Sequence, residues 1–151
     1  MKTLKYSIQI NKPQEFVFDK MMDKSIYNDW AKAFSPGSTF SAEDGWKQGA
    51  EIIFYDPENK GGTKVILEVF EPYERVFAKH IDMVDVEGKS TELDETMKKW
   101  IGSTEEYRFI ADGEIKTTLE ITIQTDKAFQ EMFDGSWPKA LELFKTVCEA
   151  N

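Results

Sequence analysis

Three polar side chains stand where acid–base chemistry would be feasible. His80 lies on a predicted strand, 75–83, and shares its parity with apolar residues of that strand. Glu105 and Tyr107 share one face of another predicted strand, 103–111. Because alternate residues of a strand point to the same side of a sheet, all three could point inward, where in principle they could act together on a polyketide-like substrate. The alternatives are a histidine that is satisfied or solvent-facing near its strand end, and a glutamate that begins its strand in solvent.

A second set of candidates is aromatic. Trp30, Phe34, Phe40 and Trp46 fall within residues 28–52, a stretch that otherwise has the composition of a loop. Loops lie on the surface and are usually polar, so four large rings here need a place to be buried. They either line or close the mouth of a ligand pocket or belong to the core, and single aromatic residues are more often in the core.

Other kinds of catalytic site are not indicated. His80 is the only histidine and Cys148 the only cysteine, which excludes His-rich and Cys-rich zinc sites. Phosphate-binding loops, dinucleotide fingerprints and nucleophile elbows are absent, and KGGTK at 60–64 fits a hairpin turn. The acidic residues of 82–95 lack calcium-loop spacing and indicate a solvated face. We expect no metal, no cofactor and an inert thiol on the buried face of the last helix.

Hydrophobic periodicity predicts the elements that position these residues. Leu4 to Ile10 alternate as in a half-buried strand, and two short helices follow, one opened by Pro13 and one capped by Asp23 and ending near Trp30. Strands are expected near 38–45, 50–56, 62–71, 75–83, 103–111 and 115–124. The clearest hairpin turn is Asp112-Gly113.

The segment from Asp126 onward changes period. Its apolar residues recur at spacings of three and four, which predicts one long helix with a wide apolar face. Gly135 and Pro138 interrupt the pattern, so we expect a kink or a broken first turn near Ser136.

Residues 82–102 form an insert that is too long for a hairpin turn. Thr91 with Asp94 resembles a capping arrangement for a short helix that precedes Trp100. Long inserts are often lids or binding loops, and the alternative is a surface excursion that packs Trp100 on the sheet edge.

Length and charge narrow the protein class. The 151 residues are expected to form a single domain, 1–151. A net charge of -9 argues against a nucleic-acid partner. The sequence has neither a signal peptide nor 18 consecutive apolar residues, so we expect no membrane insertion. A lone cysteine suits a reducing compartment, and we expect a cytoplasmic monomer or dimer.

Several motifs together support a family resemblance. They are KPQEFVFDKMMD at 12–23, DW at 29–30, the F-x-P-x-x-x-F-like run at 34–40, W-x-x-G at 46–49, EPYERVFAKH at 71–80 and W-x-x-x-L at 137–141. With the order of elements, they resemble the START-like helix-grip fold of the SRPBCC superfamily. More narrowly, they are similar to the group related to the activator of Hsp90 ATPase and to polyketide cyclases.

The resemblance implies an α+β fold in which a curved antiparallel sheet of about seven strands wraps around the long C-terminal helix. The implied order is strand, helix, helix, six strands, helix, and the space between sheet and helix is commonly a cavity for an apolar small molecule. The family usually has an aromatic pair in the strand after Arg75, where this sequence has Ala78 and His80. That wall of the cavity is therefore smaller and more polar. The insert at 82–102 also exceeds the family pattern.

The leading functional hypothesis is non-catalytic binding of a small hydrophobic ligand, lipid-like or polyketide-like, in that cavity. The residues expected to line it are Trp30, Phe34, Phe40, Trp46, His80, Trp100, Tyr107, Phe133 and Trp137. One alternative is a co-chaperone-like module with a protein partner, which an exposed apolar patch would favour. Another is a cyclase-like or hydratase-like enzyme, which polar groups converging inside a cavity would favour.

Overall fold

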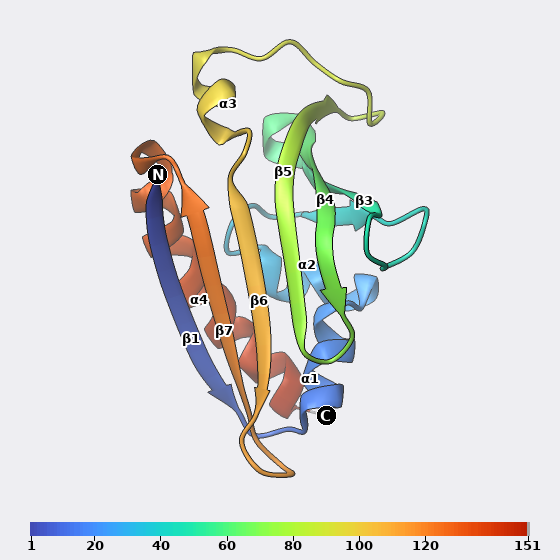
Figure 1. Cartoon of the computed structure of the whole chain (residues 1–151), viewed down its shortest axis with the longest axis vertical. Helices are drawn as coiled ribbons and strands as arrows, with labels where there is room; N and C mark the ends of the chain where they lie inside the picture. The colour runs from blue at the N-terminus through green and yellow to red at the C-terminus, as the bar shows by residue number, and fades with distance from the viewer. Residues whose placement is uncertain (151) are drawn as a thin grey trace.

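Seven strands form one antiparallel sheet in the order β1-β7-β6-β5-β4-β3-β2 in the computed structural model (Figure 1). The structure describes residues 1–150, apart from the side chain of Asn59. The strands are β1 Lys2–Ile10, β2 Thr39–Ser41, β3 Glu51–Asp56, β4 Gly61–Glu71, β5 Arg75–Asp85, β6 Thr104–Ala111 and β7 Thr117–Thr125. The first strand therefore pairs with the last, and β1 and β2 form opposite edges of the sheet.

The helices connect these edges and cover one face of the sheet. They are α1 Gln14–Met21, α2 Tyr27–Ala31, α3 Glu95–Trp100 and α4 Gln130–Glu149, with short 3₁₀ turns η1 Lys24–Ile26, η2 Pro57–Asn59 and η3 Lys127–Phe129. Helices α1 and α2 carry the chain from β1 across to β2, while α4 lies behind β1, β7 and β6 (Figure 1). This is the predicted α+β helix-grip arrangement.

Local sequence signals explain how the chain reaches the site. Pro13 occupies the N-cap of α1 with extended backbone angles, as its fixed φ favours. The carboxylate of Asp23 accepts a hydrogen bond from the N–H of Ser25 at 2.9 Å and so caps η1, which leads directly into α2. Strand β2 is only three residues long, shorter than the predicted 38–45.

Helix α4 buries one apolar face against the sheet. Phe133, Trp137, Phe144 and Cys148 are all at most 2% exposed. The sequence predicts a kink or a broken first turn near Ser136. The helix is continuous from Gln130 to Glu149 through Pro138, so the first turn is not broken. Burial raises the pKa of the Cys148 thiol to about 12, which keeps it protonated and unreactive at neutral pH.

The insert at 82–102 is partly an extension of the sheet. Strand β5 continues to Asp85, and a loop then leads to α3. The N-cap of α3 is Asp94, which accepts from the N–H of Met97 at 2.8 Å. The predicted role of Thr91 in capping is wrong, because its N–H and hydroxyl both donate to the carbonyl of Met83 and so extend the sheet pairing instead.

A β-bulge in β5 changes which residues face inward. Lys64 pairs with Asp82, but the next residue, Val65, pairs with His80, so Ile81 is an extra residue in β5. An extra residue reverses the alternation of the bulged strand. Parity read from the sequence therefore holds as far as His80 and is reversed beyond it.

Glycines allow the strands to approach closely beside this bulge. A Cβ atom on Gly62 would lie 2.3 Å from the carbonyl oxygen of Phe54 in β3, and one on Gly61 would lie 2.4 Å from that of Val84 in β5. Side chains at these two positions would push the neighbouring strands away. The two glycines thus bring Thr63, the next residue, into the sheet beside His80.

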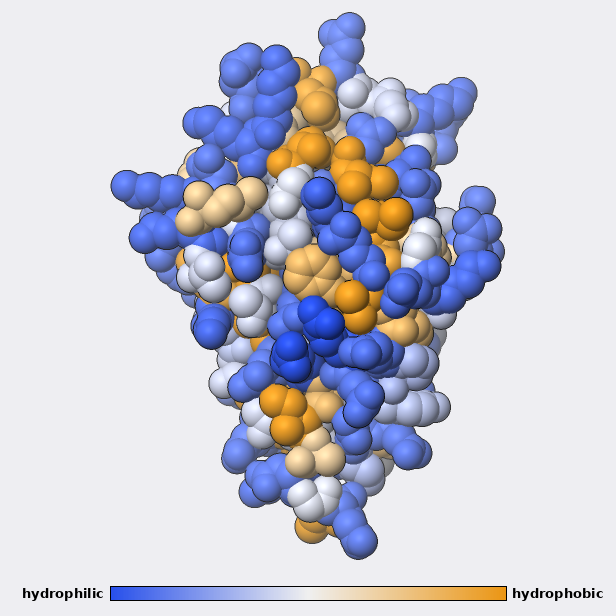
Figure 2. Space-filling view, in the orientation of Figure 1, coloured by the Kyte–Doolittle hydropathy of each residue, from blue (hydrophilic) through white to orange (hydrophobic). Residues whose placement is uncertain are grey.

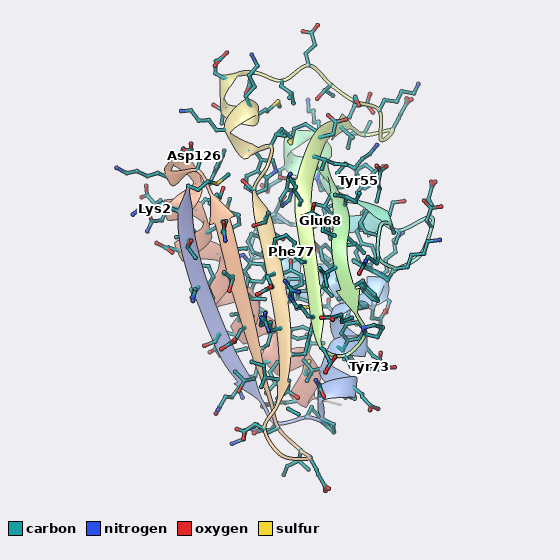
Figure 3. All side chains as sticks on the ribbon, viewed as in Figure 1. Lys2, Tyr55, Glu68, Tyr73, Phe77 and Asp126 are labelled. Carbon is teal, nitrogen blue, oxygen red and sulfur yellow. The ribbon has the colours of Figure 1, made fainter. Side chains whose placement is uncertain are left out.

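Hydrophilic residues predominate on the outer face of the sheet, with hydrophobic residues between them along its middle (Figure 2). Glu68 of β4 is exposed, whereas Phe77 of β5 is half-buried, with the Arg75 guanidinium 5.7 Å from its ring centroid (Figure 3). Within residues 1–150, no helix is long and apolar enough to cross a membrane.

Candidate functional site

A cavity of about 290 Å³ lies between the sheet, α2 and α4. Aromatic side chains dominate its lining: Tyr27, Trp30, Phe34, Phe54, Tyr55, Trp100, Tyr107, Phe133 and Trp137. Small or polar residues complete it, namely Ala31, Ser35, Ser38, Asp56, Thr63, His80 and Glu105, together with Met132. Its volume is close to the lower end of the roughly 300–1,000 Å³ typical of ligand pockets.

Three polar side chains from neighbouring strands converge on one wall of this cavity. The Tyr107 hydroxyl donates to a carboxylate oxygen of Glu105 at 2.9 Å. The other oxygen of Glu105 lies 3.5 Å from Nε2 of His80, a contact that is electrostatic because its geometry is poor for a hydrogen bond. Of the alternatives that strand parity left open, the structure has the inward orientation for all three residues.

Thr63 fixes the orientation of the histidine from the opposite side. Its hydroxyl oxygen lies 2.8 Å from Nδ1 of His80 and accepts from Nε1 of Trp100 at 3.1 Å. The hydroxyl also lies 3.4 Å from the carbonyl oxygen of Asp82, to which it can donate. Thr63 thus links Trp100 to His80, whose Nε2 lies toward Glu105.

The surroundings push the two acidic groups of this wall in opposite directions. Burial, the largest influence, raises the pKa of Glu105, but interactions with His80 and Tyr107 outweigh it and hold the pKa below its usual value. Burial and the nearby Glu105 charge raise the pKa of Tyr107 well above its usual value. At neutral pH the wall therefore holds a glutamate anion and a neutral phenol.

Small neighbours make room for the carboxylate. Glu105 pairs with Ala78 across β5 and with Ile123 across β7. The alanine stands where the family resemblance leads one to expect an aromatic side chain. Its small side chain leaves space beside Glu105, which is 14% exposed.

Two tryptophan N–H groups near the cavity lack an acceptor. Nε1 of Trp30 and Nε1 of Trp137 are buried and have no hydrogen-bond partner among the described residues. The two rings stack with centroids 6.2 Å apart. Buried hydrogen-bond donors usually have a partner. Within the described residues, the hydrogen-bonding capacity of these two indole N–H groups is therefore not satisfied.

The structure places seven of the nine predicted lining residues around this cavity and two elsewhere. Phe40 and Trp46 line a separate space of about 20 Å³ on the far side of Tyr27. The Tyr27 ring contacts Trp30 at 5.0 Å on one side and Phe40 at 5.1 Å on the other. Tyr27 therefore borders both spaces, as do Trp30, Phe54 and Tyr107, whereas Phe40 and Trp46 line only the smaller one.

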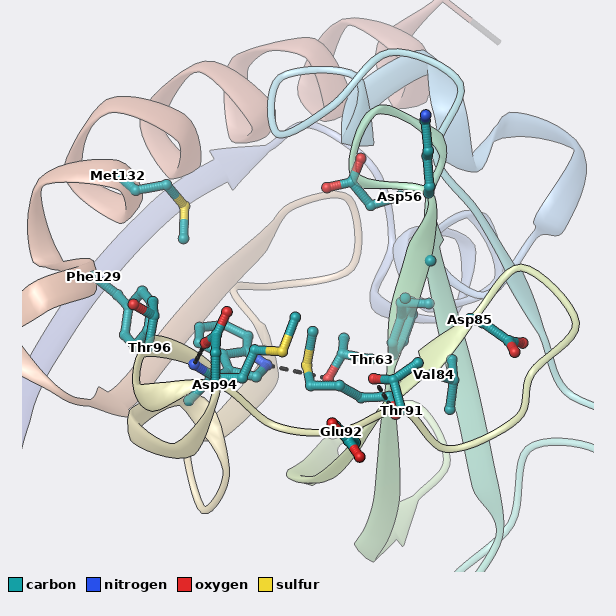
Figure 4. Close-up of a pocket in the computed structure, with 17 residues that line it drawn as sticks. Asp56, Thr63, Val84, Asp85, Thr91, Glu92, Asp94, Thr96, Phe129 and Met132 are labelled. Atoms are coloured by element: carbon teal, nitrogen blue, oxygen red, sulfur yellow. Dashed lines mark hydrogen bonds between the residues drawn. The ribbon is translucent and has the colours of Figure 1, made fainter.

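An outer groove of about 610 Å³ adjoins the cavity beneath α3 and its preceding loop (Figure 4). Phe54, Asp56, Thr63, Trp100 and Met132 line both spaces. The Trp100 ring packs 4.4 Å from His80 and 5.7 Å from Phe133. The packing of Trp100 over the sheet is compatible with both hypotheses for the insert, a lid and a surface excursion, and does not choose between them.

Sequence reasoning missed several lining residues, above all Tyr27, Thr63 and Met132. Thr63 sits in the KGGTK segment, which the sequence analysis assigned to a turn. Thr63 and Val65 are two residues apart in β4 and so point to the same face of the sheet, and Val65 is buried. This spacing could have indicated that Thr63 points inward. Met132 belongs to the apolar residues that recur at helical spacing in the last segment, but it is 43% exposed at the start of α4, and the spacing did not indicate that it borders the cavity.

The exposed large apolar residues lie at separate places. Met1 precedes β1, Tyr73 is in the β4–β5 turn, Val86 is in the loop before α3, Ile110 is near the end of β6, Ile115 is in the β6–β7 turn, and Met132 is on α4. Within the described residues, these positions span both ends of the molecule. They give little support to the interaction-module alternative.

Comparison with known proteins relates the chain to others at the level of structure. Neither a scan of protein-family models nor a search of curated protein sequences finds a match. The Aha1 dimer from Colwellia psychrerythraea matches with a TM-score of 0.71 at 16% identity, over 99% of this chain and 97% of that chain. A START superfamily protein from Mycobacterium smegmatis matches with a TM-score of 0.71 at 7% identity, over 98% and 97%.

A third solved structure is a protein from the dynemicin biosynthetic locus. It matches with a TM-score of 0.69 at 11% identity, over 99% of this chain and 48% of that chain. This chain has a START-like fold. The resemblance inferred from the sequence motifs is confirmed, and at these identities the matches establish the fold alone.

Proposed function

We propose that the protein binds a small, largely apolar molecule in the cavity between the sheet and α4, without transforming it. The observation that carries this proposal is the 290 Å³ space lined by nine aromatic side chains. Burial of apolar ligand surface would supply affinity at roughly 25 cal/mol per Å². The unpartnered N–H groups of Trp30 and Trp137 support an occupant with a hydrogen-bond acceptor.

The fold comparisons support the same choice in general terms. A START-like fold places its long helix against a curved sheet, and here that helix contributes Met132, Phe133 and Trp137 to the cavity lining. The outer groove adjoins the cavity and shares five lining residues with it. A module that acts only through a protein surface needs neither feature.

Catalysis is the second candidate because polar groups do converge in the cavity. Glu105, Tyr107 and His80 form a connected wall. Acid–base catalysts, however, work best with pKa values near the working pH. The pKa of Glu105 is lowered and that of Tyr107 is raised, so both move away from neutrality. This electrostatic pattern favours a binding site over a general base and acid.

A neutral fluorescent dye, N-phenyl-1-naphthylamine, tests the binding proposal. We expect one dye per chain, with increased emission, and weaker binding in a Met132→Trp variant. Met132 is exposed and lines both the cavity and the groove, so a larger ring there narrows the entrance without disturbing the core.

Ile115→Trp is the matched control. Ile115 is 75% exposed in the β6–β7 turn, at the opposite end of the molecule from α3 (Figure 1). It should bind the dye as the wild type does. Equal binding by wild type and Met132→Trp, or no binding by wild type, would contradict the proposal.

A further inference from the structure

The charges that line the cavity have one sign. Its described lining residues include the carboxylates Glu105 and Asp56 and no lysine or arginine. The imidazole of His80 lies 3.5 Å from Glu105 and makes no hydrogen bond through Nε2 to the described residues. The carboxylate of Glu105 therefore faces no lysine or arginine among the described lining residues.

Glu105 keeps hydrogen-bonding capacity. A carboxylate offers about four lone-pair sites, and Glu105 receives one good hydrogen bond, from Tyr107 at 2.9 Å, and the longer 3.5 Å contact from His80. Its backbone neighbours across the sheet are Ala78 and Ile123, which add no polar side-chain group. A partly buried carboxylate in such a place is stabilised by a cation that comes to it.

The rings of the cavity favour the same charge. Aromatic faces attract cations, and tryptophan does so most strongly. Three of the four tryptophans, Trp30, Trp100 and Trp137, line the cavity together with Tyr107. Aromatic walls around a carboxylate provide both the attraction and the apolar contact that a hydrophobic amine needs.

The approach to the cavity is also acidic. Asp85, Glu92 and Asp94 line the outer groove with Asp56, and Lys60 is the one basic residue among the described lining residues (Figure 4). The Asp85 carboxylate accepts hydrogen bonds from the N–H groups of Lys89 and Glu87, which lower its pKa and keep it negatively charged. With a net charge of -9 for the chain, the resulting field attracts cations and repels anions.

We propose that the ligand is a small hydrophobic organic cation, a protonated or quaternary amine on an apolar body, whose charge lies against Glu105. This inference rests on the ligand-binding function proposed above and narrows it to a chemical class. Fatty acids, phosphate esters and other anionic amphiphiles are correspondingly disfavoured.

Two probes of the same shape test this choice. Phenyltrimethylammonium carries a fixed positive charge, and tert-butylbenzene replaces its nitrogen by carbon. Benzenesulfonate supplies the opposite charge. Each is titrated against the wild-type protein carrying N-phenyl-1-naphthylamine, and displacement is followed by fluorescence. We expect phenyltrimethylammonium to bind at least about tenfold more tightly than tert-butylbenzene. Benzenesulfonate should bind most weakly of the three.

Glu105→Gln tests the residue itself. Glutamine keeps the size and can still accept from Tyr107, but it removes the charge. We expect it to abolish the preference for the cation while the affinity for tert-butylbenzene stays within about twofold. Glu68→Gln is the matched control, because it removes one charge from an exposed residue on the outer face of the sheet (Figure 3), and it should keep the preference.

The outcomes separate the two proposals. Wild-type protein that binds tert-butylbenzene or benzenesulfonate as tightly as the cation overturns the cation proposal, as does a preference that survives Glu105→Gln. In both cases dye binding still supports an apolar ligand. The wild-type comparison needs no variant, so it decides the matter even if Glu105→Gln fails to fold. A wild-type protein that binds neither dye nor probes overturns the ligand-binding function as well.

Discussion

The two sides of Tyr27 contain the same kind of residue and yet differ in packing. On one side, the ring centroids of Phe40 and Trp46 are 5.3 Å apart, and the two rings border a space of only about 20 Å³, enough for about one water molecule. On the other side, Trp30 and Trp137 border a cavity of about 290 Å³. Aromatic content alone therefore does not distinguish a core from a pocket.

The difference comes from what accompanies the rings. On the filled side, Phe40 contacts the rings of Tyr27, Trp46 and Phe54. On the open side, small residues such as Ala31, Ser35 and Ser38 line the space together with the rings, and Glu105, Tyr107 and His80 form a polar wall. Small and polar side chains cannot fill the volume that a ring would fill, so the cavity stays open.

The largest expected effect compares one ring from each side. Phe40→Ala should cost about 3–5 kcal/mol of unfolding free energy, because it removes a fully enclosed ring. Phe34→Ala should cost about 1–2 kcal/mol, because Phe34 is half-buried and already borders empty space. Denaturant unfolding of both variants measures the difference, and equal costs would show that the two sides are packed alike.

A smaller effect is expected at the polar wall. Thr63→Val leaves Nε1 of Trp100 and Nδ1 of His80 without their shared partner, which should cost about 1–3 kcal/mol. Thr63→Ser keeps the hydroxyl and should cost less. Thermal unfolding of the two variants tests this prediction. If Thr63→Val is as stable as Thr63→Ser, the hydrogen bonds of Thr63 to His80 and Trp100 do not stabilise the cavity wall.

The smallest effect is a pH dependence. The folded-state pKa of Glu105 lies below its ordinary value of 4.5, because His80 and Tyr107 offset the effect of burial. The folded state thus binds this proton less readily than the unfolded state, so the stabilisation is present above about pH 4.5 and is lost as the pH falls through the folded pKa. The difference in unfolding free energy between wild type and Glu105→Gln should therefore shrink between pH 7 and pH 3. A constant difference would contradict the assigned electrostatics.

Much of the fold and part of the site could be predicted from sequence. Alternation along β5 and β6 indicated that His80, Glu105 and Tyr107 face inward, and spacings of three and four indicated the buried face of α4 that carries Phe133 and Trp137. These signals are readable because side-chain direction repeats with a fixed period within one element. They say which way a residue points, but not what it meets.

The rest depended on distances between elements. That Thr63 contacts His80 follows from the bulge at Ile81 and from the close approach that Gly61 and Gly62 permit. Neither feature has a periodic signal in the sequence. The assignment of KGGTK to a simple turn missed Thr63 for this reason.

The sequence by itself determined the order of elements, the inward faces of the strands and helix, and the stock of aromatic and acidic residues. Only the tertiary structure decided that Tyr27 separates Phe40 and Trp46 from the cavity, and that Glu105 lies among tryptophans from α2, α3 and α4. The physical reason is that direction within an element is set by local backbone geometry. Empty volume and charge balance arise where several distant elements meet, and they depend on the packing of all of them together.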